Sequence, residues 1–291
     1  MANLKEIRLR ITSVNSTMQI TSAMKMVSAA KLKRAQDAIT RMRPYAEKMQ
    51  EILSNVSSSL DASEGIYSQQ RDVKNVLVVA ITSNRGLCGG FNNNVIKEIR
   101  NQMKADFGNA NVKILSLGKK AFDVYKKTSH HSTEGLGESP YSVFDKLTFS
   151  NSSAIADVIM KQFVAGKYDK VVLVYNKFKN AASQLIVTEQ FLPVVPTQVE
   201  GKSSQTDYIF EPQKEQIIDE LIPRTLKVQL FKALLDSVAS EHGARMTAMH
   251  KATDNAGALV KELKLNYNKA RQAAITGEIL EIVAGAESLK G

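Results

Sequence analysis

The first sixty residues carry apolar side chains at alternating intervals of three and four positions. Between Leu4 and Leu60, fourteen of the seventeen positions at this spacing are apolar. A 3.5-residue repeat held over about eight heptads is typical of a helix in a coiled coil. Pro44 lies inside this helix and predicts a bend or a break there. Because so long a helix cannot bury its apolar stripe alone, it needs a partner helix.

The last part of the chain has the same helical period. Pro212 suits a first helical turn, and residues 213–289 are compatible with one long helix. Its apolar stripe consists of Leu221, Val228, Phe231, Leu235, Val238, Met249, Ala252, Ala256, Leu259, Leu263, Ala270, Ala273, Leu280 and Ala284. Alanine and glycine are dense over 239–258, which favours close approach of a second helix, and Pro223 predicts a bend or a restart. The simplest arrangement pairs the two terminal helices antiparallel.

Between the terminal helices, short runs of β-branched residues alternate with helical spacing. Strands of the buried type are predicted at Asn75–Thr82, Val112–Leu117, Val171–Tyr175 and Gln184–Phe191. Helices are predicted at Asn94–Asp106 and Lys119–Lys127, and a third is predicted to be capped by Ser152 or Ser153. This alternation is typical of an α/β domain with a mostly parallel sheet.

These patterns predict the fold class α/β, in which a long antiparallel coiled coil of the N- and C-terminal helices adjoins a Rossmann-like α/β domain. The expected division is a coiled-coil helix over 1–65, a central α/β domain over 70–210, and a helix over 212–291 that pairs with the first. Loops are expected at 57–70, 129–141 and 193–206.

Composition narrows the class of protein. The 291 residues are 43% hydrophobic and 23% charged, which excludes a disordered chain and a disulfide scaffold. A single cysteine forms no internal disulfide, so the fold needs no oxidising compartment. The longest apolar runs are far shorter than the ~20 residues of a membrane-spanning helix, and the N-terminus lacks the apolar stretch of a signal peptide. We therefore expect a soluble protein of a reducing compartment.

The net charge of +10 is concentrated near the N-terminus. Residues 1–60 contain ten basic and four acidic side chains, whereas the remaining segments are closer to balance. This excess suggests an acidic partner for the first helix, either nucleic acid or an acidic protein surface. A basic helix face that is simply solvated explains the charge equally well.

Motifs for chemistry are almost absent. The loop Arg85–Phe91, Arg-Gly-Leu-Cys-Gly-Gly-Phe, follows a predicted strand and precedes a helix, where doubly wound folds bind a nucleotide phosphate. Neither Gly-Lys-Ser/Thr nor GxGxxG is present, so glycines that allow tight turns are the favoured interpretation. Cys88 has no nearby histidine or cysteine, and the adjacent His130 and His131 lack metal-ligand spacing. We expect no catalytic residue, no cofactor site and no metal site.

Polar residues occupy some positions of the predicted helices at which a regular coiled coil would have apolar residues. Thr21, Lys25 and Ser28 are consecutive on the N-terminal stripe, and His242 falls on the C-terminal stripe, where an interface histidine is favoured over a ligand. Polar positions of the C-terminal helix include Arg245, Asp254, Asn255, Arg271, Gln272, Thr276 and Glu278. They specify register or face solvent, or they present this region to a partner; both interpretations stay open.

Several blocks of sequence resemble the γ subunit of F-type ATP synthases of the bacterial type, the rotating central stalk of the F1 sector. The N-terminal block is Ile20–Val27, and the middle block is Thr82–Asn92, with Ser-Asn where family members often have an Asp before the Arg. The C-terminal blocks are Ser240–Met249, Tyr267–Gln272 and Ile275–Glu278. The resemblance covers the whole chain in order, and the C-terminal blocks are its most specific part.

The resemblance implies a function and a set of partners. Family members place the paired terminal helices inside a ring of three α and three β subunits, with the α/β domain at the foot near the membrane. Proton flow turns the membrane c-ring and the attached γ subunit, and rotation drives each β site through its binding states. The implied partners are this α3β3 ring, the epsilon subunit and the c-ring, without nucleic acid. The chemistry belongs to β, so the γ subunit is a non-catalytic subunit.

The resemblance also implies contact residues. Met24 and Lys25 match the region beside an acidic lever of β. Arg271, Gln272, Thr276 and Glu278 match positions that engage β loops, and Arg245 lies in a similarly implicated stretch. The basic excess over 1–60 fits an acidic lever. The lack of an organelle transit peptide leads us to expect a bacterial protein, peripheral on the cytoplasmic side of the inner membrane.

Two rival functions remain open. One is a nucleotide-binding enzyme built on the middle domain, for which tight binding of ATP to 70–210 would be the mark. The other is a coiled-coil scaffold or a nucleic-acid binder that uses the basic N-terminal helix, and steeply salt-dependent DNA affinity would support it. Composition and spacing by themselves favour the scaffold, whereas the resemblance favours the rotor.

Overall fold

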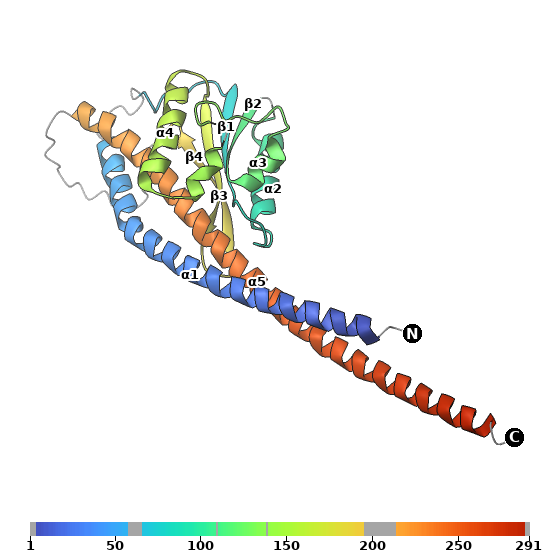
Figure 1. Ribbon diagram of the computed structural model, residues 1–291. Helices are drawn as coiled ribbons and strands as arrows, with labels where there is room; N and C mark the ends of the chain where they lie inside the picture. Colours follow the sequence, from blue (N-terminus) through green and yellow to red (C-terminus); the bar gives the residue numbers. More distant parts are fainter. Residues whose placement is uncertain (1–3, 58–65, 109, 138, 195–213, 289–291) are drawn as a thin grey trace. The chain divides into compact units, whose positions relative to one another are not determined.

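The computed structural model describes residues 4–57, 66–108, 110–137, 139–194 and 214–288 (Figure 1). The chain divides into two compact units. The helical unit comprises Met1–Ser28 and Met246–Gly291, and the α/β unit comprises Ala29–Arg245. The expected loops at 57–70 and 193–206 lie largely outside the described residues, so the domain division proposed across them stays a prediction.

Helix α1 runs from Leu4 to Ser57 without interruption. Of the bend or break predicted at Pro44, no break occurs: the helix continues through the proline, and its axis bends in the light-blue last part of the ribbon (Figure 1). The predicted stripe is confirmed where burial is described, because Ile7, Leu32 and Ile39 on it are buried. Polar Thr21 and Ser28 on the same stripe are buried as well.

Helix α5 runs from Lys214 to Ser288 and belongs to both units. Pro223 lies inside it and does not restart the helix. Among the described residues, no helix combines the length and apolar character needed to cross a membrane.

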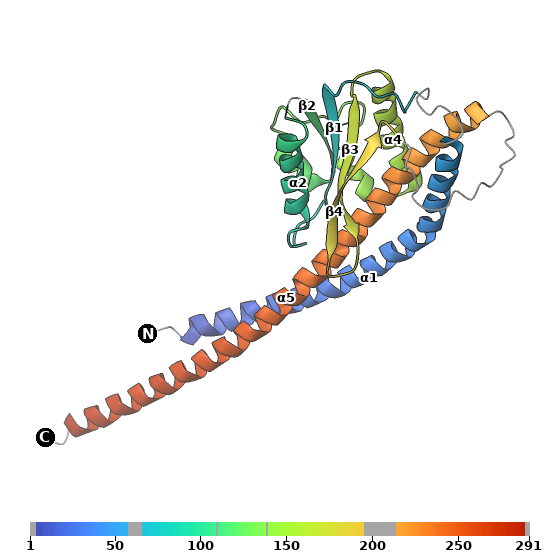
Figure 2. The same ribbon diagram turned by 180° about the vertical axis from the view of Figure 1, so that it is seen from behind.

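The α/β unit contains a four-stranded sheet in the order β2-β1-β3-β4 (Figure 2). Strand β1 (Asn75–Ile81) pairs in parallel with β2 (Asn111–Leu117) and with β3 (Lys170–Phe178). Strand β4 (Gln184–Leu192) pairs antiparallel with β3, because a short turn joins the two. In this turn the Asn180 side chain accepts hydrogen bonds from the backbone of the next residues. The prediction of a mostly parallel sheet is confirmed.

Helices cover both faces of the sheet, as Figures 1 and 2 show. Helices α2 (Phe91–Ala105) and α3 (Lys119–Tyr125) pack on the face that receives Val76, Val78 and Ala80 of β1. The other face receives the alternate residues of β1 and is covered by α4 (Phe149–Val164), the 3-10 helix η1 (Pro140–Phe144) and part of α5. The strand is therefore apolar throughout because both of its faces are buried.

The start of α4 differs from the sequence prediction. Thr148 caps the helix, and its Oγ1 accepts a hydrogen bond of 3.3 Å from the backbone N–H of Asn151. Ser152, predicted as a cap, is buried one turn into the helix and donates to the backbone carbonyl of Phe149 at 2.9 Å. Ser153, the other predicted cap, also lies inside the helix, whose first residue, Phe149, packs its ring edge-on against Phe231.

Part of α5 lies in the core of the α/β unit. Leu226, Leu230 and Leu234 recur every four residues and are buried against the sheet together with Tyr175 of β3. Ser240, six residues after Leu234, donates to the backbone carbonyl of Asn176 at 2.9 Å. This stretch of α5 is therefore as buried as a central strand.

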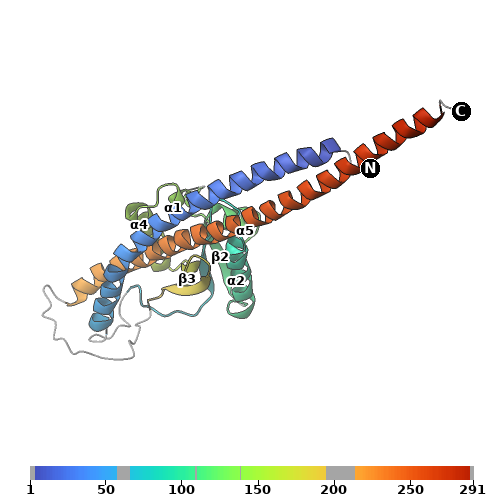
Figure 3. The ribbon, with the colours of Figure 1, turned by 90° about the horizontal axis from the view of Figure 1, so that it is seen from below.

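In the helical unit, α1 and α5 run antiparallel and side by side in all three views (Figures 1–3). The hydroxyl oxygens of Thr21 and Thr253 lie 2.8 Å apart and form a hydrogen bond between the helices. A Cβ atom added at Gly257 would make ordinary van der Waals contact with Met18 Sδ at 3.7 Å, so the two helices lie close together here. The pairing of Thr21 settles its role as a register contact inside the unit.

Candidate functional site

The last part of α5 has no cover within the helical unit. It continues past the first described residue of α1 in all three views (Figures 1–3). Met249, Ala256 and Val260 are buried, but no side chain in the described stretch 261–288 is. The apolar stripe predicted for this helix is therefore buried in part as far as Ala256 and is not buried beyond Val260. Leu280, which belongs to that stripe, is 63% exposed.

A second apolar stripe occupies the exposed end of α5. Ile275, Ile279, Ile282 and Val283 follow the i, i+4, i+7, i+8 spacing of one helix face, and all four are exposed. At about 100° per residue this face lies away from the Ala284 side of the helix. We call these four residues the outer stripe of α5. Nothing in the described part of the chain covers it.

The residues predicted from the resemblance to contact β flank this outer stripe. Arg271 and Glu278 are seven positions apart and lie along one edge of it, while Gln272 and Thr276 are four apart and lie along the other. All four are exposed. Within the described residues, neither Arg271 nor Glu278 forms an ion pair, so their charges are directed to solvent. The four residues and the outer stripe form one amphipathic surface.

A similar surface occurs on α1 beside Met24. Ile20, Met24 and Val27 follow i, i+4, i+7 spacing, and Ile20 and Val27 are 60% and 57% exposed. We call these three residues the outer stripe of α1. Met24 itself is half-buried, as is the neighbouring Lys25. The structure thus places both predicted contact regions next to exposed apolar residues.

Arg245 lies elsewhere, inside the α/β unit. Its side chain is 8% exposed and forms an ion pair of 2.7 Å with Glu241 Oε1. Nε and Nη2 donate to the backbone carbonyl of Gly86 at 3.2 Å, and Nη2 also donates to the carbonyl of Arg85 at 3.2 Å. Its guanidinium therefore ties α5 to the glycine loop, residues 82–90, which joins β1 to α2. The contact with β that the resemblance implies for Arg245 stays a prediction.

The glycine loop is strained and held from within. Leu87 has a φ of 62°, a left-handed conformation that a non-glycine residue adopts at a cost of about 1–2 kcal/mol, and its side chain is 64% exposed. The backbone N–H of Ser83 donates to Asn92 Oδ1, and Asn92 Nδ2 donates back to Ser83 Oγ, both at 2.9 Å. Gly89 has a φ of 59°, which agrees with glycines that serve a tight turn.

The charges around Arg245 are shifted by burial. Burial raises the pKa of Glu241, and the adjacent Arg245 opposes this shift. Burial also lowers the pKa of His242 to about 4, with help from Arg245 and Lys31. His242 Nδ1 lies 3.3 Å from Arg245 Nη1, which can only donate, so the neutral ring accepts this hydrogen bond. The surroundings of Arg245 therefore favour a charged guanidinium on this residue and a neutral ring on His242.

The remaining candidate groups have structural roles. Cys88 is buried, and burial raises the pKa of its thiol, which disfavours the nucleophilic thiolate. His130 Nδ1 lies 2.9 Å from the Val112 carbonyl, and the ring of His131 meets Phe122 edge-on. Searching the described residues finds no cluster of three or more histidine, cysteine or acidic side chains that could hold a metal ion.

Sequence reasoning missed both outer stripes, although their signal is present. The spacing of Ile275 and Ile279 is helical, but neither residue belongs to the apolar stripe predicted for this helix, which contains Leu280. A second helical stripe on a helix that already has one indicates two covered faces. The link from Arg245 to Gly86 had no such signal, because 159 residues separate the two.

Comparison with known sequences gives one consistent result. A family model described as ATP synthase matches residues 3–289. The chain is 62% identical to the ATP synthase gamma chain of Flavobacterium johnsoniae over 293 aligned residues, with 100% of both chains covered. It is 45% identical to the ATP synthase gamma chain of Geobacter metallireducens, again with 100% of both covered.

Solved structures show the same fold. A chain in the central stalk and c-ring of the mitochondrial ATP synthase of Tetrahymena thermophila is 26% identical, with a TM-score of 0.56 over 80% of this chain and 99% of that one. A chain of the Euglena gracilis mitochondrial ATP synthase has a TM-score of 0.64, covers 98% of this chain and 94% of that one, and is 20% identical. The second likeness concerns the fold alone.

Proposed function

Because the chain belongs to the family of ATP synthase gamma chains, we propose that the outer stripes of α1 and α5 are the surfaces through which it acts on its partners. The chain is a central-stalk subunit of this rotary complex, and it associates with the α3β3 ring and with the membrane c-ring. Its task is to convert rotation into conformational change at catalytic sites that lie on partner β subunits.

The observation that carries the proposal is the uncovered end of α5. Large exposed apolar patches mark interaction surfaces, and here the apolar residues lie on a helix that the chain itself does not cover. Arg271 and Glu278 on one edge, and Gln272 and Thr276 on the other, supply polar contacts around an apolar centre. A ring of partner subunits would cover such a helix on all sides.

On α1, the proposed contact has a different chemistry. Met24 lies in the outer stripe, and the ammonium group of Lys25 adds a positive charge beside it. An acidic segment of β would fit the apolar stripe and the positive charge together. Its carboxylates would pair with Lys25, and its apolar residues would contact Ile20 and Val27. Contact at a few positions lets the rest of the shaft turn with little resistance.

We also propose that the chain is non-catalytic and that ATP is made or hydrolysed on β alone. The buried Cys88 supports this, because its thiol is held in the unreactive protonated form. The proposed location is the cytoplasmic side of a bacterial inner membrane, peripheral to it, with the epsilon subunit as a further partner. Similarity to the gamma chains of Flavobacterium and Geobacter supports this location.

The test replaces one charged residue at a time in the assembled complex. Arg271→Ala and Glu278→Ala should each lower rotation-coupled ATP synthesis roughly fivefold, which corresponds to the loss of ~1 kcal/mol of contact energy. Glu281→Ala is the matched control, because Glu281 is exposed on the face of the same helix that lies away from the outer stripe and from all four flanking residues. The isolated variants should unfold at the same urea concentration as the unmodified chain.

Two outcomes would contradict the proposed contacts. One is unchanged synthesis in both the Arg271 and the Glu278 variants. The other is an equal loss in the Glu281 control, which would indicate a general effect of charge on the helix. Copurification of the tagged chain with three α and three β subunits tests the assembly itself, and recovery of the chain with nucleic acid and without ATPase activity would favour the scaffold hypothesis.

A further inference from the structure

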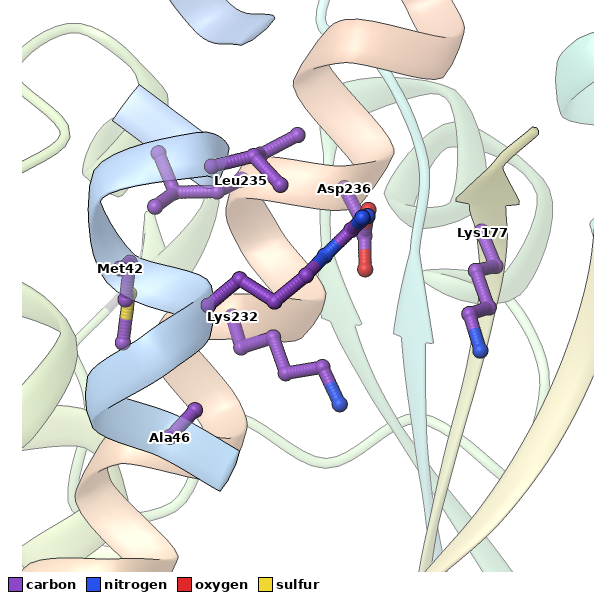
Figure 4. A pocket seen from close by; sticks show the side chains of 8 residues that line it. Met42, Ala46, Lys177, Lys232, Leu235 and Asp236 are labelled. Atoms are coloured by element: carbon purple, nitrogen blue, oxygen red, sulfur yellow. The ribbon is translucent and has the colours of Figure 1, made fainter. Parts of the chain in front are cut away.

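A cavity of about 340 Å³ opens in the α/β unit between α1, β3 and α5. Figure 4 shows Met42 and Ala46 on α1, Lys177 on β3, and Lys232 and Asp236 on α5 around it. The complete lining consists of Ile39, Met42, Arg43, Ala46, Lys177, Lys232, Leu235 and Asp236. Its volume lies within the ~300–1,000 Å³ range of small-molecule sites.

Three cations surround one buried carboxylate in this cavity. Arg43, Lys177 and Lys232 each contribute a positive charge, whereas Asp236 contributes the one negative charge, so the lining carries a net charge of about +2. Such an excess attracts an anion with two negative charges. This cavity lies among residues that the family resemblance does not assign to any contact.

Asp236 is the unusual member of the group. Its side chain is only 3% exposed, and its Oδ1 finds no hydrogen-bond partner among the residues that the structure describes. Burial raises the pKa of Asp236, and the positive charges of Lys232, Lys177 and Arg43 oppose this shift. A buried hydrogen-bond acceptor without a donor costs free energy, so a ligand that donates a hydrogen bond to Oδ1 would be favoured here.

A monoprotonated phosphate has both required properties. It carries two negative charges for the three cations, and its single P–OH group can donate a hydrogen bond to Asp236 Oδ1. Sulfate has the same charge and nearly the same size but carries no proton at neutral pH, so it would place an oxygen lone pair against the carboxylate. We propose that this cavity binds a phosphate group and selects it over sulfate through Asp236.

The cavity has room for more than the phosphate. Its apolar wall is formed by Ile39, Met42 and Leu235, on the side of α1 and α5. Inorganic phosphate would leave this wall to water, whereas a small phosphate ester would place its organic part against it. A phosphate ester keeps a P–OH group only as its monoanion, so at neutral pH the free ion meets both requirements and the dianionic ester does not. Glycerol 3-phosphate is the probe that separates the two.

The first experiment is titration calorimetry on the purified full-length chain at constant ionic strength. Inorganic phosphate should bind with one site per chain, and sulfate should bind at least roughly tenfold more weakly, the cost of one unsatisfied charged acceptor. Glycerol 3-phosphate, which at neutral pH is mostly a dianion without a P–OH group, should bind more weakly than inorganic phosphate. Tighter binding of the ester would overturn the role given to the proton.

Variants separate this site from general attraction to a basic protein. Lys177→Gln should weaken phosphate binding roughly tenfold, as expected for one charge-assisted hydrogen bond. Lys179→Gln is the matched control, since Lys179 is exposed two residues further along the chain and does not line the cavity. Equal weakening in the two variants would overturn the proposal.

Asp236→Asn provides the sharpest readout, because an amide can donate to either anion. In this variant sulfate should bind as well as phosphate, so the selectivity disappears even if the affinity for phosphate changes little. Should this variant fail to fold, the comparison of Lys177→Gln with Lys179→Gln still tests whether phosphate binds in the cavity. Absence of saturable phosphate binding at about 10 mM, or equal affinity of the unmodified chain for phosphate and sulfate, would overturn the proposal.

Discussion

Helix α5 has two parts with the same apolar character and opposite surroundings. In the α/β unit, Leu226, Leu230 and Leu234 pack in the core of the sheet. In the helical unit, Ile275, Ile279 and Ile282 have the same type of spacing and face solvent. The local sequence therefore does not tell which apolar stripe is buried in the fold of the chain and which one is exposed and available to a partner.

The buried and the exposed part of α5 also differ in what their residues contribute to, namely the stability of the single chain or the function of the assembled complex. Residues in the buried part contribute to the free energy of folding of the single chain, and their removal should unfold it. Residues in the exposed part contribute little to that free energy, and their removal should appear only in the assembled complex. Arg245 lies at the end of the buried part and belongs to the first group, because its charge is satisfied inside the chain.

The largest expected effect concerns the core. Leu230→Ala should lower the free energy of unfolding of the isolated chain by about 4 kcal/mol, because Leu230 is fully buried and its loss leaves a cavity. Leu280→Ala makes the same chemical change where the side chain is 63% exposed and should alter it by less than about 0.5 kcal/mol. Urea unfolding followed by circular dichroism measures both, and similar values for the two would remove the distinction between the parts of α5.

The next effect concerns Arg245. Arg245→Ala should cost about 3 kcal/mol, the lower end of the range for a broken buried ion pair, since Glu241 can take up a proton in response. Hydrogen exchange should rise at the backbone of the glycine loop, where Gly86 loses its donor. Arg271→Ala is the control at an exposed arginine and should leave both quantities unchanged. A stable Arg245 variant with a protected loop would show that the guanidinium does not hold the loop.

The smallest effect is a pH dependence. His242 has a pKa of about 4 in the folded chain and of about 6.5 when unfolded, so the unfolded state binds a proton first as the pH falls. Stability contributed by His242 is thus present above pH ~6.5 and is lost as the pH falls toward 4, by about 1 kcal/mol between pH 7 and 5 once solvent screening of a half-buried ring is included.

Urea unfolding at both pH values checks this expectation. His242→Gln should remove that part of the acid sensitivity, whereas His250→Gln, at an exposed histidine, should retain it. Glu241 titrates in the opposite sense, because its raised pKa favours the folded state at low pH, but it is common to all three proteins. An unchanged acid sensitivity in the His242 variant would mean that other groups control it.

Much of the fold could be predicted because its signals are local. The β-branched run at Asn75–Thr82 became β1, which ends one residue earlier, and the 3.5-residue repeat of the first helix correctly marked Ile7 and Leu32 as covered. The cap at Thr148 was missed because serine and threonine are both favoured capping residues, so the local sequence offered several starting points for this helix.

The candidate surfaces could be predicted only in part. The resemblance marked Arg271 and Glu278, but the apolar centre between the flanking residues became visible only once the exposure of Ile275 and Ile279 was known. The same residue type at Arg245 is buried, a difference that no local pattern records. Whether these residues contact β stays a prediction.

The sequence by itself determined the helices, the strands and the alternation that produces a mostly parallel sheet, because each of these depends on neighbours within a few residues. It also determined the family, through motifs that extend along the whole chain. Tertiary structure alone decided which apolar stripes are covered, that Arg245 bonds to Gly86, and that Arg43, Lys177 and Lys232 line one cavity with Asp236. Those outcomes depend on contacts between segments far apart in the chain, which form only when the core packs and which leave no periodic trace in the sequence.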